Sequence, residues 1–260
     1  MDHRVDSLYI STPCKVGGSN YDFLAKKRYR ESSQLRVLLC GFLVFPFVVK
    51  WTDAFSIARI DANSPEHTPA FLKFAAILLL FEWTWFFIAW VGICKYGKVS
   101  FRQLIGGKWN RSSEIFRDLG LGLLTFAILL MTGAFLQQLL ARFQNDSTVM
   151  RSMSPQNSVE ATAFMALALT AGFVEEFVFR GYLQAQFTAI TGNVVVASIL
   201  QLLLFIQGHY FQGLLRLIPV GVLGLLLTLV ALWRKSLKPG IIGHALGDGL
   251  GSILFLLKRL

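Results

Sequence analysis

Two adjacent glutamates and an arginine interrupt a stretch of the chain that is otherwise apolar enough to lie in a membrane. The stretch is residues 172–183, GFVEEFVFRGYL, and its charged residues are Glu175, Glu176 and Arg180. Charge inside a bilayer is costly and is usually retained for function. Glu176 and Arg180 are four residues apart, so on a helix they share a face and can pair. Glu175 lies about 100° away around the helix, has no basic residue three or four positions further on, and is left available as a general base.

Two histidines and an aspartate in later apolar stretches could act together with Glu175. His209 ends the segment FIQGH, one turn after Phe205. In IIGHALGD, His244 and Asp248 are four residues apart and therefore project from one face of a helix. This spacing suits two groups that act on one ligand, or an aspartate that orients the histidine. Each of these residues also has a purely structural alternative. His209 could have an interfacial or packing role, and His244 and Asp248 could form a hydrogen-bonded pair that only stabilises close helix contact.

The positions of these residues along their helices predict which of them meet. Glu175 lies 17 residues before the predicted helix break at Gly192, and His209 lies 17 residues after it. At about 1.5 Å per residue both are roughly 25 Å from the break, so antiparallel helices would bring them to one level. His244 lies only a few residues after the turn at Pro239. It would meet the other two only if the helices are staggered or tilted, or if the cavity is a deep funnel.

The composition indicates a polytopic membrane protein. Of 260 residues, 54% are hydrophobic and 15% are charged, whereas a soluble domain carries about 25% charged residues. The formal net charge is +10, but the Lys and Arg residues lie between the apolar runs, which favours membrane-topology signals over nucleic-acid binding. The three cysteines include no CxxC pair, which argues against a disulfide framework and against a thiolate metal site.

Apolar periodicity predicts an all-α bundle of seven transmembrane helices, with eight as the alternative, around an intramembrane polar cavity. The predicted spans cover residues 37–51, 74–94, 119–141, 159–189, 194–210, 217–233 and 241–257. A short interfacial helix is expected at 101–105. The segments assigned to the inside carry 16 Lys or Arg residues and those assigned to the outside carry seven. This difference predicts a cytosolic N-terminus and an outside C-terminus.

The chain divides into three regions on these grounds. Residues 1–36 are expected to form a basic cytosolic arm, residues 37–150 the N-terminal transmembrane helices, and residues 151–260 the helical core that carries the polar cluster. Glu82 lies within the second predicted span, and it is the one carboxylate that this pattern places inside the membrane away from the cluster.

Three motifs in the core resemble those of a known family. EEFVFR, FIQGH and HALGD are similar to EExxxR, FxxxH and HxxxN or HxxxD of the CAAX protease and bacteriocin-processing (CPBP, or Abi) family, which includes the type II CAAX prenyl endopeptidases. The resemblance covers about residues 155–257 and none of the first three spans. It implies a helical membrane endopeptidase whose active site lies within the bilayer and opens to the cytosol.

The resemblance also implies a role for each motif residue. Glu175 corresponds to the catalytic glutamate, His209 to its partner in activating water, and His244 with Asp248 to the pair that forms an oxyanion hole. Asp248 stands where the prenyl endopeptidases have Asn, and a carboxylate donates a hydrogen bond only when it is protonated. Asp248 is therefore alternatively expected to hold His244 in its donating tautomer. The supporting residues of the motifs are Glu176, Arg180 and Phe205.

The residue types leave alternatives for cofactor and function. A zinc ion bound by Glu175, His209 and His244 is the alternative to metal-free water activation. There is no HExxH segment, so the zincin pattern is absent, and we favour a glutamate-type peptidase without a cofactor. A transporter or ion carrier that uses buried Glu, His and Asp residues, or a non-catalytic membrane protein of the bacteriocin-immunity type, would also fit. The expected partners are the lipid bilayer and a membrane-anchored or lipidated peptide, with no nucleic acid, and the favoured location is a bacterial inner membrane.

Overall fold

The protein is a helical bundle in the part that the computed structural model describes, which is residues 36, 39–41, 60, 63–96, 100–143 and 154–257. The all-α prediction is confirmed for these residues, which contain no strand. The basic arm and the predicted span at 37–51 lie almost wholly outside them. In chain order the α-helices are α3 (His67–Trp90), α4 (Phe101–Leu104), α5 (Ser112–Leu140), α7 (Ser158–Glu175), α8 (Gln184–Thr191), α9 (Val194–Gly208), α10 (Leu217–Arg234) and α11 (Lys238–Leu257).

One continuous helix of 34 residues runs through the middle of the bundle, because α7 continues through the π-helix η4 (Glu176–Leu183) into α8. Asn157 caps its first turn by accepting a hydrogen bond from the backbone N–H of Glu160. Gly192 ends it in the left-handed conformation, at φ 66°. The predicted helix at 159–189 and the break after it are thereby confirmed. At about 1.5 Å per residue the helix is roughly 50 Å long, which exceeds the hydrocarbon core of about 30 Å.

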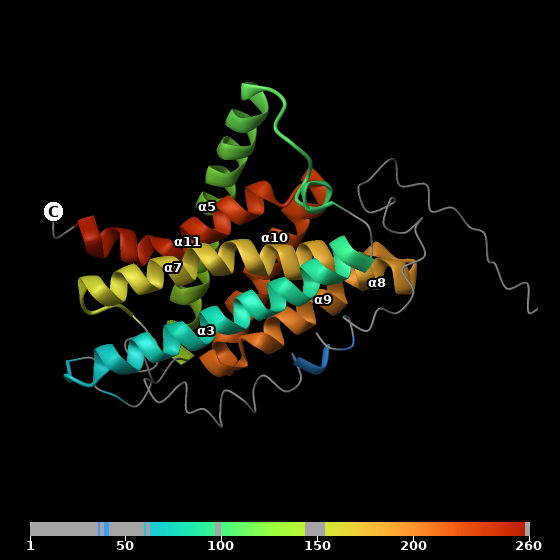
Figure 1. The fold of residues 1–260 in the computed structure, drawn as a ribbon. Helices are drawn as coiled ribbons and strands as arrows, with labels where there is room; N and C mark the ends of the chain where they lie inside the picture. Colours follow the sequence, from blue (N-terminus) through green and yellow to red (C-terminus); the bar gives the residue numbers. More distant parts are fainter. Residues whose placement is uncertain are drawn as a thin grey trace, which may run out of the picture.

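Helices α3 and α11 lie on either side of α7 (Figure 1). α3 runs parallel to α7, and two contacts set their register. His67 Nδ1 lies 3.1 Å from Glu160 Oε1, and the rings of Phe71 and Phe164, each four residues further along, are 6.4 Å apart. α3 begins before the predicted span at 74–94 because its polar first turn is buried against Glu160.

Small residues allow α11 to run close to both α7 and α5. A Cβ added to Gly172 of α7 would lie 2.6 Å from the backbone nitrogen of Ala245, and one added to Gly243 of α11 would lie 2.7 Å from Cγ2 of Thr125. α5 crosses α11 at a steep angle (Figure 1, green). Glycine at these crossings therefore sets how closely the helices that carry the polar residues can approach.

Four helical segments in the described residues are long and apolar enough to cross a membrane: His67–Ile93, Ser112–Phe143, Ser158–Thr191 and Leu214–Arg234. α9 is apolar but only 15 residues long, and α11 is not among the four. Large apolar side chains on these helices are exposed, including Leu80, Phe87 and Met131, and such a surface suits contact with lipid. These helices support an integral membrane protein, while the count of seven spans stays a prediction.

Candidate active site

Glu176 and Arg180 form a buried ion pair in the interior of the bundle. Arg180 Nη1 donates to Glu176 Oε1 over 3.0 Å, and neither side chain is exposed. The predicted pairing at four-residue spacing is confirmed, and the π-helix η4 carries it. Arg180 Nη2 donates to the carbonyl oxygen of Gly224 over 2.9 Å, and its guanidinium lies 4.3 Å from the ring centroid of Phe205. The buried cation thus has acceptors and an aromatic face around it, which offset its loss of water.

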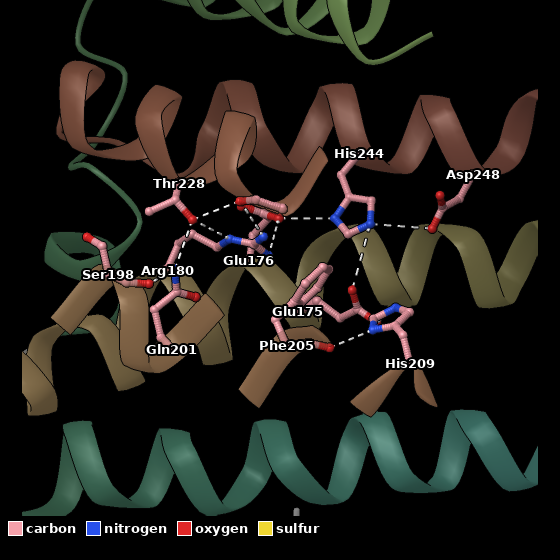
Figure 2. Close-up of polar contacts among 11 residues, drawn as sticks. Glu175, Glu176, Arg180, Ser198, Gln201, Phe205, His209, Thr228, His244 and Asp248 are labelled. Atoms are coloured by element: carbon pink, nitrogen blue, oxygen red, sulfur yellow. Dashed lines mark hydrogen bonds and ion pairs between the residues drawn. The ribbon is translucent and has the colours of Figure 1, made fainter. Parts of the chain in front are cut away.

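Polar side chains of α9 and α10 hold this pair in place (Figure 2). Thr228 Oγ1 accepts a hydrogen bond from Gln201 Nε2 over 2.9 Å and donates to the carbonyl oxygen of Gly224 over 2.8 Å. Arg180 Nε donates to the same hydroxyl over 3.5 Å. This network ties η4 to α9 and α10 and so fixes the position of the two adjacent glutamates.

Glu175 points away from that pair, toward His209 at the end of α9 (Figure 2). Its Oε1 lies 3.9 Å from His209 Nε2. The other ring nitrogen, Nδ1, lies 2.8 Å from the carbonyl oxygen of Phe205. Since a carbonyl oxygen only accepts, this contact assigns a proton to Nδ1 and leaves Nε2 facing Glu175. The predicted meeting of Glu175 and His209 across the break at Gly192 is confirmed.

His244 of α11 lies between the two glutamates and reaches both. Its Nδ1 is 3.0 Å from Glu176 Oε1, and its Nε2 is 3.7 Å from Glu175 Oε2. Asp248, one turn further along α11, has its Oδ2 3.4 Å from the same Nε2. The site residues predicted from the sequence therefore lie together in one cluster, and they come from α7, η4, α9 and α11.

The difference in depth expected for His244 is absent, because the turn between α10 and α11 lies part-way along the central helix. A Cβ added to Gly181 would lie 3.2 Å from Cδ1 of Leu237, and one added to Gly240 would lie 3.1 Å from Glu176 Oε2. The turn is thus about ten residues, or roughly 15 Å, short of the end of α8. α11 consequently starts near η4, so it is staggered along the central helix, which is one of the arrangements that the sequence allowed for His244.

Glu176 is the carboxylate that orients the His244 ring, a role that the sequence suggested for Asp248. Glu176 accepts from Nδ1 of His244, the ring nitrogen turned away from Glu175. Asp248 lies beside Nε2, which is the nitrogen that faces Glu175, and its side chain is 46% exposed. Asp248 therefore borders the open side of the cluster.

A cavity of about 430 Å³ opens beside the cluster. His209, His244 and Asp248 lie on its wall, together with Arg216 at the start of α10. The other lining residues are mostly apolar and come from α5 and α10, among them Leu129, Leu130, Ala134, Val220, Leu223 and Leu227. Its volume is typical of sites that bind small molecules or a few residues of peptide. The cluster is therefore accessible from one side and closed by packed helices on the other.

Glu82 also belongs to the cluster, although the sequence pattern placed it away from the other polar residues. Glu82 of α3 lies next to the carboxyl group of Glu175. Glu82 follows His67 by 15 residues and Glu175 follows Glu160 by 15, so the parallel register of α3 and α7 brings them to the same level. The apolar periodicity of the span indicates on which side of the helix Glu82 lies. It does not indicate which other helix packs against that side.

Metal-free activation of water stays a prediction, and the alternative zinc site would take its ligands from Glu175, His209 and His244. Glu175 turns different oxygens to the two histidines, Oε1 to His209 and Oε2 to His244, at 3.9 and 3.7 Å. Within the described residues, no group of three or more His, Cys, Asp or Glu side chains is arranged to hold a metal ion.

The comparison with protein families decides the identity of this core. Residues 157–250 match the family model described as type II CAAX prenyl endopeptidase Rce1-like, and the match includes Glu175, Glu176, His209, His244 and Asp248. This segment is similar to the type II CAAX prenyl endopeptidases, which belong to the CAAX protease (CPBP) family. The resemblance inferred from the three motifs is thereby confirmed. Neither a curated protein nor a solved structure matches the chain.

The match to this family model supports a peptidase that works in a membrane, in agreement with the long apolar helices. The family also implies a bilayer environment and a membrane-associated substrate. The CPBP match begins at the cap of α7, so α3, α4 and α5 lie outside it. Two of these helices nevertheless contribute to the site: α5 lines the cavity, and α3 supplies Glu82.

Proposed function

We propose that the chain is an intramembrane endopeptidase of the glutamate type, in which Glu175 activates a water molecule for attack on a peptide bond. One observation carries this proposal. His209 and His244 both line the cavity and both turn Nε2 toward Glu175. A carboxylate and an imidazole nitrogen that face each other can hold and polarise one water molecule.

In this mechanism the water binds between Glu175 and His209. Glu175 Oε1 and His209 Nε2 are 3.9 Å apart, which is too far for a direct hydrogen bond but lets one water oxygen lie about 2.8 Å from each. His209 keeps its proton on Nδ1, so its Nε2 accepts from the water, and Glu175 accepts from the second O–H. Glu175 then takes that proton while the water oxygen bonds to the peptide carbonyl carbon.

His244 stabilises the negative charge that develops on the carbonyl oxygen. Glu176, which pairs with Arg180, accepts the Nδ1–H of His244. Nε2 lies between Glu175 and Asp248, so a ring protonated on both nitrogens donates from Nε2 to an oxyanion bound beside them. An ionised Asp248 cannot donate. Its charge, 3.4 Å from Nε2, instead stabilises the imidazolium form of His244.

The proposed substrate is a lipidated or otherwise membrane-anchored peptide, and a prenylated C-terminal CAAX segment is the class that the family match favours. The cavity supports this choice because its wall is mainly apolar on the side of α5 and α10 and polar at His209, His244 and Asp248. A peptide whose lipid stays among apolar side chains can then present its scissile bond to Glu175.

The proposal includes a membrane orientation. The excess of Lys and Arg in the segments assigned to the inside supports seven spans with the N-terminus in the cytosol, and we favour a bacterial inner membrane. Fusions of a periplasm-active reporter enzyme and a cytosol-active one to each end test it. Activity of the periplasmic reporter at the N-terminus would contradict this orientation.

The test of the proposed function is cleavage of membrane-anchored peptides by the purified protein in liposomes. We expect Glu175→Ala, His209→Ala and His244→Ala each to lower kcat by about 100-fold or more. Glu66→Ala is the matched control, because Glu66 is an exposed carboxylate outside the cluster, and it should cleave like the wild type. Wild-type rates in all three cluster variants would contradict the proposal.

A further inference from the structure

We propose that Glu82 of α3 is a positioning residue of the active site, which stays protonated and donates a hydrogen bond that holds the ionised carboxylate of Glu175 in place. This inference rests on the proposed function of Glu175 as the general base. It adds a residue that lies outside the family match at 157–250, so the three motifs do not account for it.

The buried face of α3 includes Glu82. Phe71, eleven residues earlier, and Ala89, seven residues later, are both 0% exposed. Eleven residues are about three turns and seven are about two turns, so all three side chains point in nearly the same direction. Glu82 therefore faces the interior of the bundle.

The register of α3 on α7 brings Glu82 to Glu175. The residues eleven positions before each, Phe71 and Phe164, have rings 6.4 Å apart. Parallel helices advance equally along the chain, so a contact at one such pair predicts a contact at the equivalent pair further on. The proximity of the Glu82 and Glu175 carboxyl groups agrees with that register.

A hydrogen bond between two carboxyl groups requires a proton on one of them, because an ionised carboxylate only accepts. Two ionised carboxylates in contact would also repel each other. Oε2 of Glu82 and Oε2 of Glu175 are both buried, and neither accepts a hydrogen bond from a donor among the described residues. One proton therefore lies between them.

The surroundings assign that proton to Glu82. Glu175 faces Nε2 of His244 over 3.7 Å, and the imidazolium form of His244 donates from that nitrogen toward the carboxylate. Glu82 pairs with Glu175 from the other side, on α3. The other charged or titratable groups near the pair are Asp248, next to His244, and Glu176, which is engaged by Arg180. Glu82 thus holds Glu175 from the side of α3, while Oε1 of Glu175 faces His209.

Two substitutions of similar size distinguish the effect of the hydrogen-bond donor at residue 82 from the effect of side-chain shape. Glu82→Gln keeps a hydrogen-bond donor, whereas Glu82→Met removes it. A hydrogen bond to a charged group contributes about 1.5–3 kcal/mol, so we expect Glu82→Met to lower kcat by about 10- to 100-fold with an unchanged KM. Glu82→Gln should restore kcat to within a few-fold of the wild type. Wild-type kcat in Glu82→Met, or an equal loss in both variants, would overturn the proposal.

A second measurement does not depend on cleavage and so keeps this inference separate from the proposed function. Infrared spectroscopy of the purified protein in liposomes should detect the carbonyl stretch of a protonated carboxylic acid shielded from water. The band should be lost in Glu82→Gln and kept in Glu66→Gln, whose carboxylate is exposed. Absence of the band in the wild type, or its persistence in Glu82→Gln, would refute the assigned proton. Failure of the wild type to cleave any peptide would refute only the proposed function.

Discussion

Replacing Glu176 by Gln should chiefly lower the stability of the bundle. Oε1 of Glu176 accepts from Arg180 Nη1 and from His244 Nδ1, each over 3.0 Å, and Glu176 and Arg180 are fully buried. A neutral amide removes the negative charge that faces the buried guanidinium of Arg180, and breaking a buried ion pair in this way costs about 3–5 kcal/mol. In a protein of this size each kcal/mol lowers Tm by about 2–4 °C, so Tm should fall by roughly 6–20 °C.

The same change at Glu175 should chiefly lower activity. The nearest basic groups to Glu175 are the two imidazoles at 3.7 and 3.9 Å, and its side chain is 11% exposed. Gln has the same size and still accepts from Glu82, so the free energy of unfolding should change by less than about 1 kcal/mol. Loss of the general base should lower kcat by about 100- to 10,000-fold.

Thermal unfolding in detergent, followed by tryptophan fluorescence, measures the first effect. Single-turnover cleavage in liposomes, well below both melting temperatures, measures the second. Glu66→Gln serves as the control because it removes an exposed carboxylate outside the site. The reasoning is refuted if Glu175→Gln keeps the full cleavage rate, or if Glu176→Gln has the same Tm as the wild type.

Three further substitutions probe the packing and charges around the site. Gly172→Ala puts a Cβ 2.6 Å from the backbone nitrogen of Ala245, so the free energy of unfolding should fall by about 1–3 kcal/mol. The rate constant kcat should also fall, because His244, next to Ala245, moves. An unchanged Tm and kcat would speak against the close crossing. Asp248→Asn supplies an amide donor to the oxyanion and should keep kcat within about 10-fold, whereas Asp248→Leu should lower it about 100-fold; similar rates for the two would argue against a polar role. Asp118→Asn weakens the 2.9 Å pair with Arg234 and should cost about 1–3 kcal/mol of unfolding free energy without changing kcat below Tm, and a selective loss of kcat would contradict this assignment.

Local spacing in the sequence predicted the parts of the site that lie on one helix or on two helices joined by a short turn. Glu176 and Arg180 pair because four residues are about one turn. Glu175 meets His209 because both are equally far from Gly192, where a left-handed glycine reverses the chain. The central helix was predictable for a related reason, since its cap and its break are both local features of the sequence.

Contacts between helices distant in the sequence were not predictable in the same way. His244 reaches the glutamates because the turn before α11 lies next to Gly181, and periodicity does not tell how far along a neighbour a turn will lie. Glu82 was assigned away from the cluster for a similar reason. Its partner depends on the register of α3 on α7, which the contact between His67 and Glu160 sets.

The most direct test of the central claim follows the oxygen of the attacking water. A single turnover of the wild-type protein with a membrane-anchored peptide, in water enriched in heavy oxygen, should place the label in the new carboxylate of the product and none in the protein. Mass spectrometry of both measures this. Glu175→Gln should leave the peptide intact and unlabelled. Heavy oxygen in the side chain of Glu175 after turnover would mean covalent attack by this carboxylate, and labelled product from Glu175→Gln at the wild-type rate would mean that another group activates the water; either result would contradict general-base catalysis by Glu175.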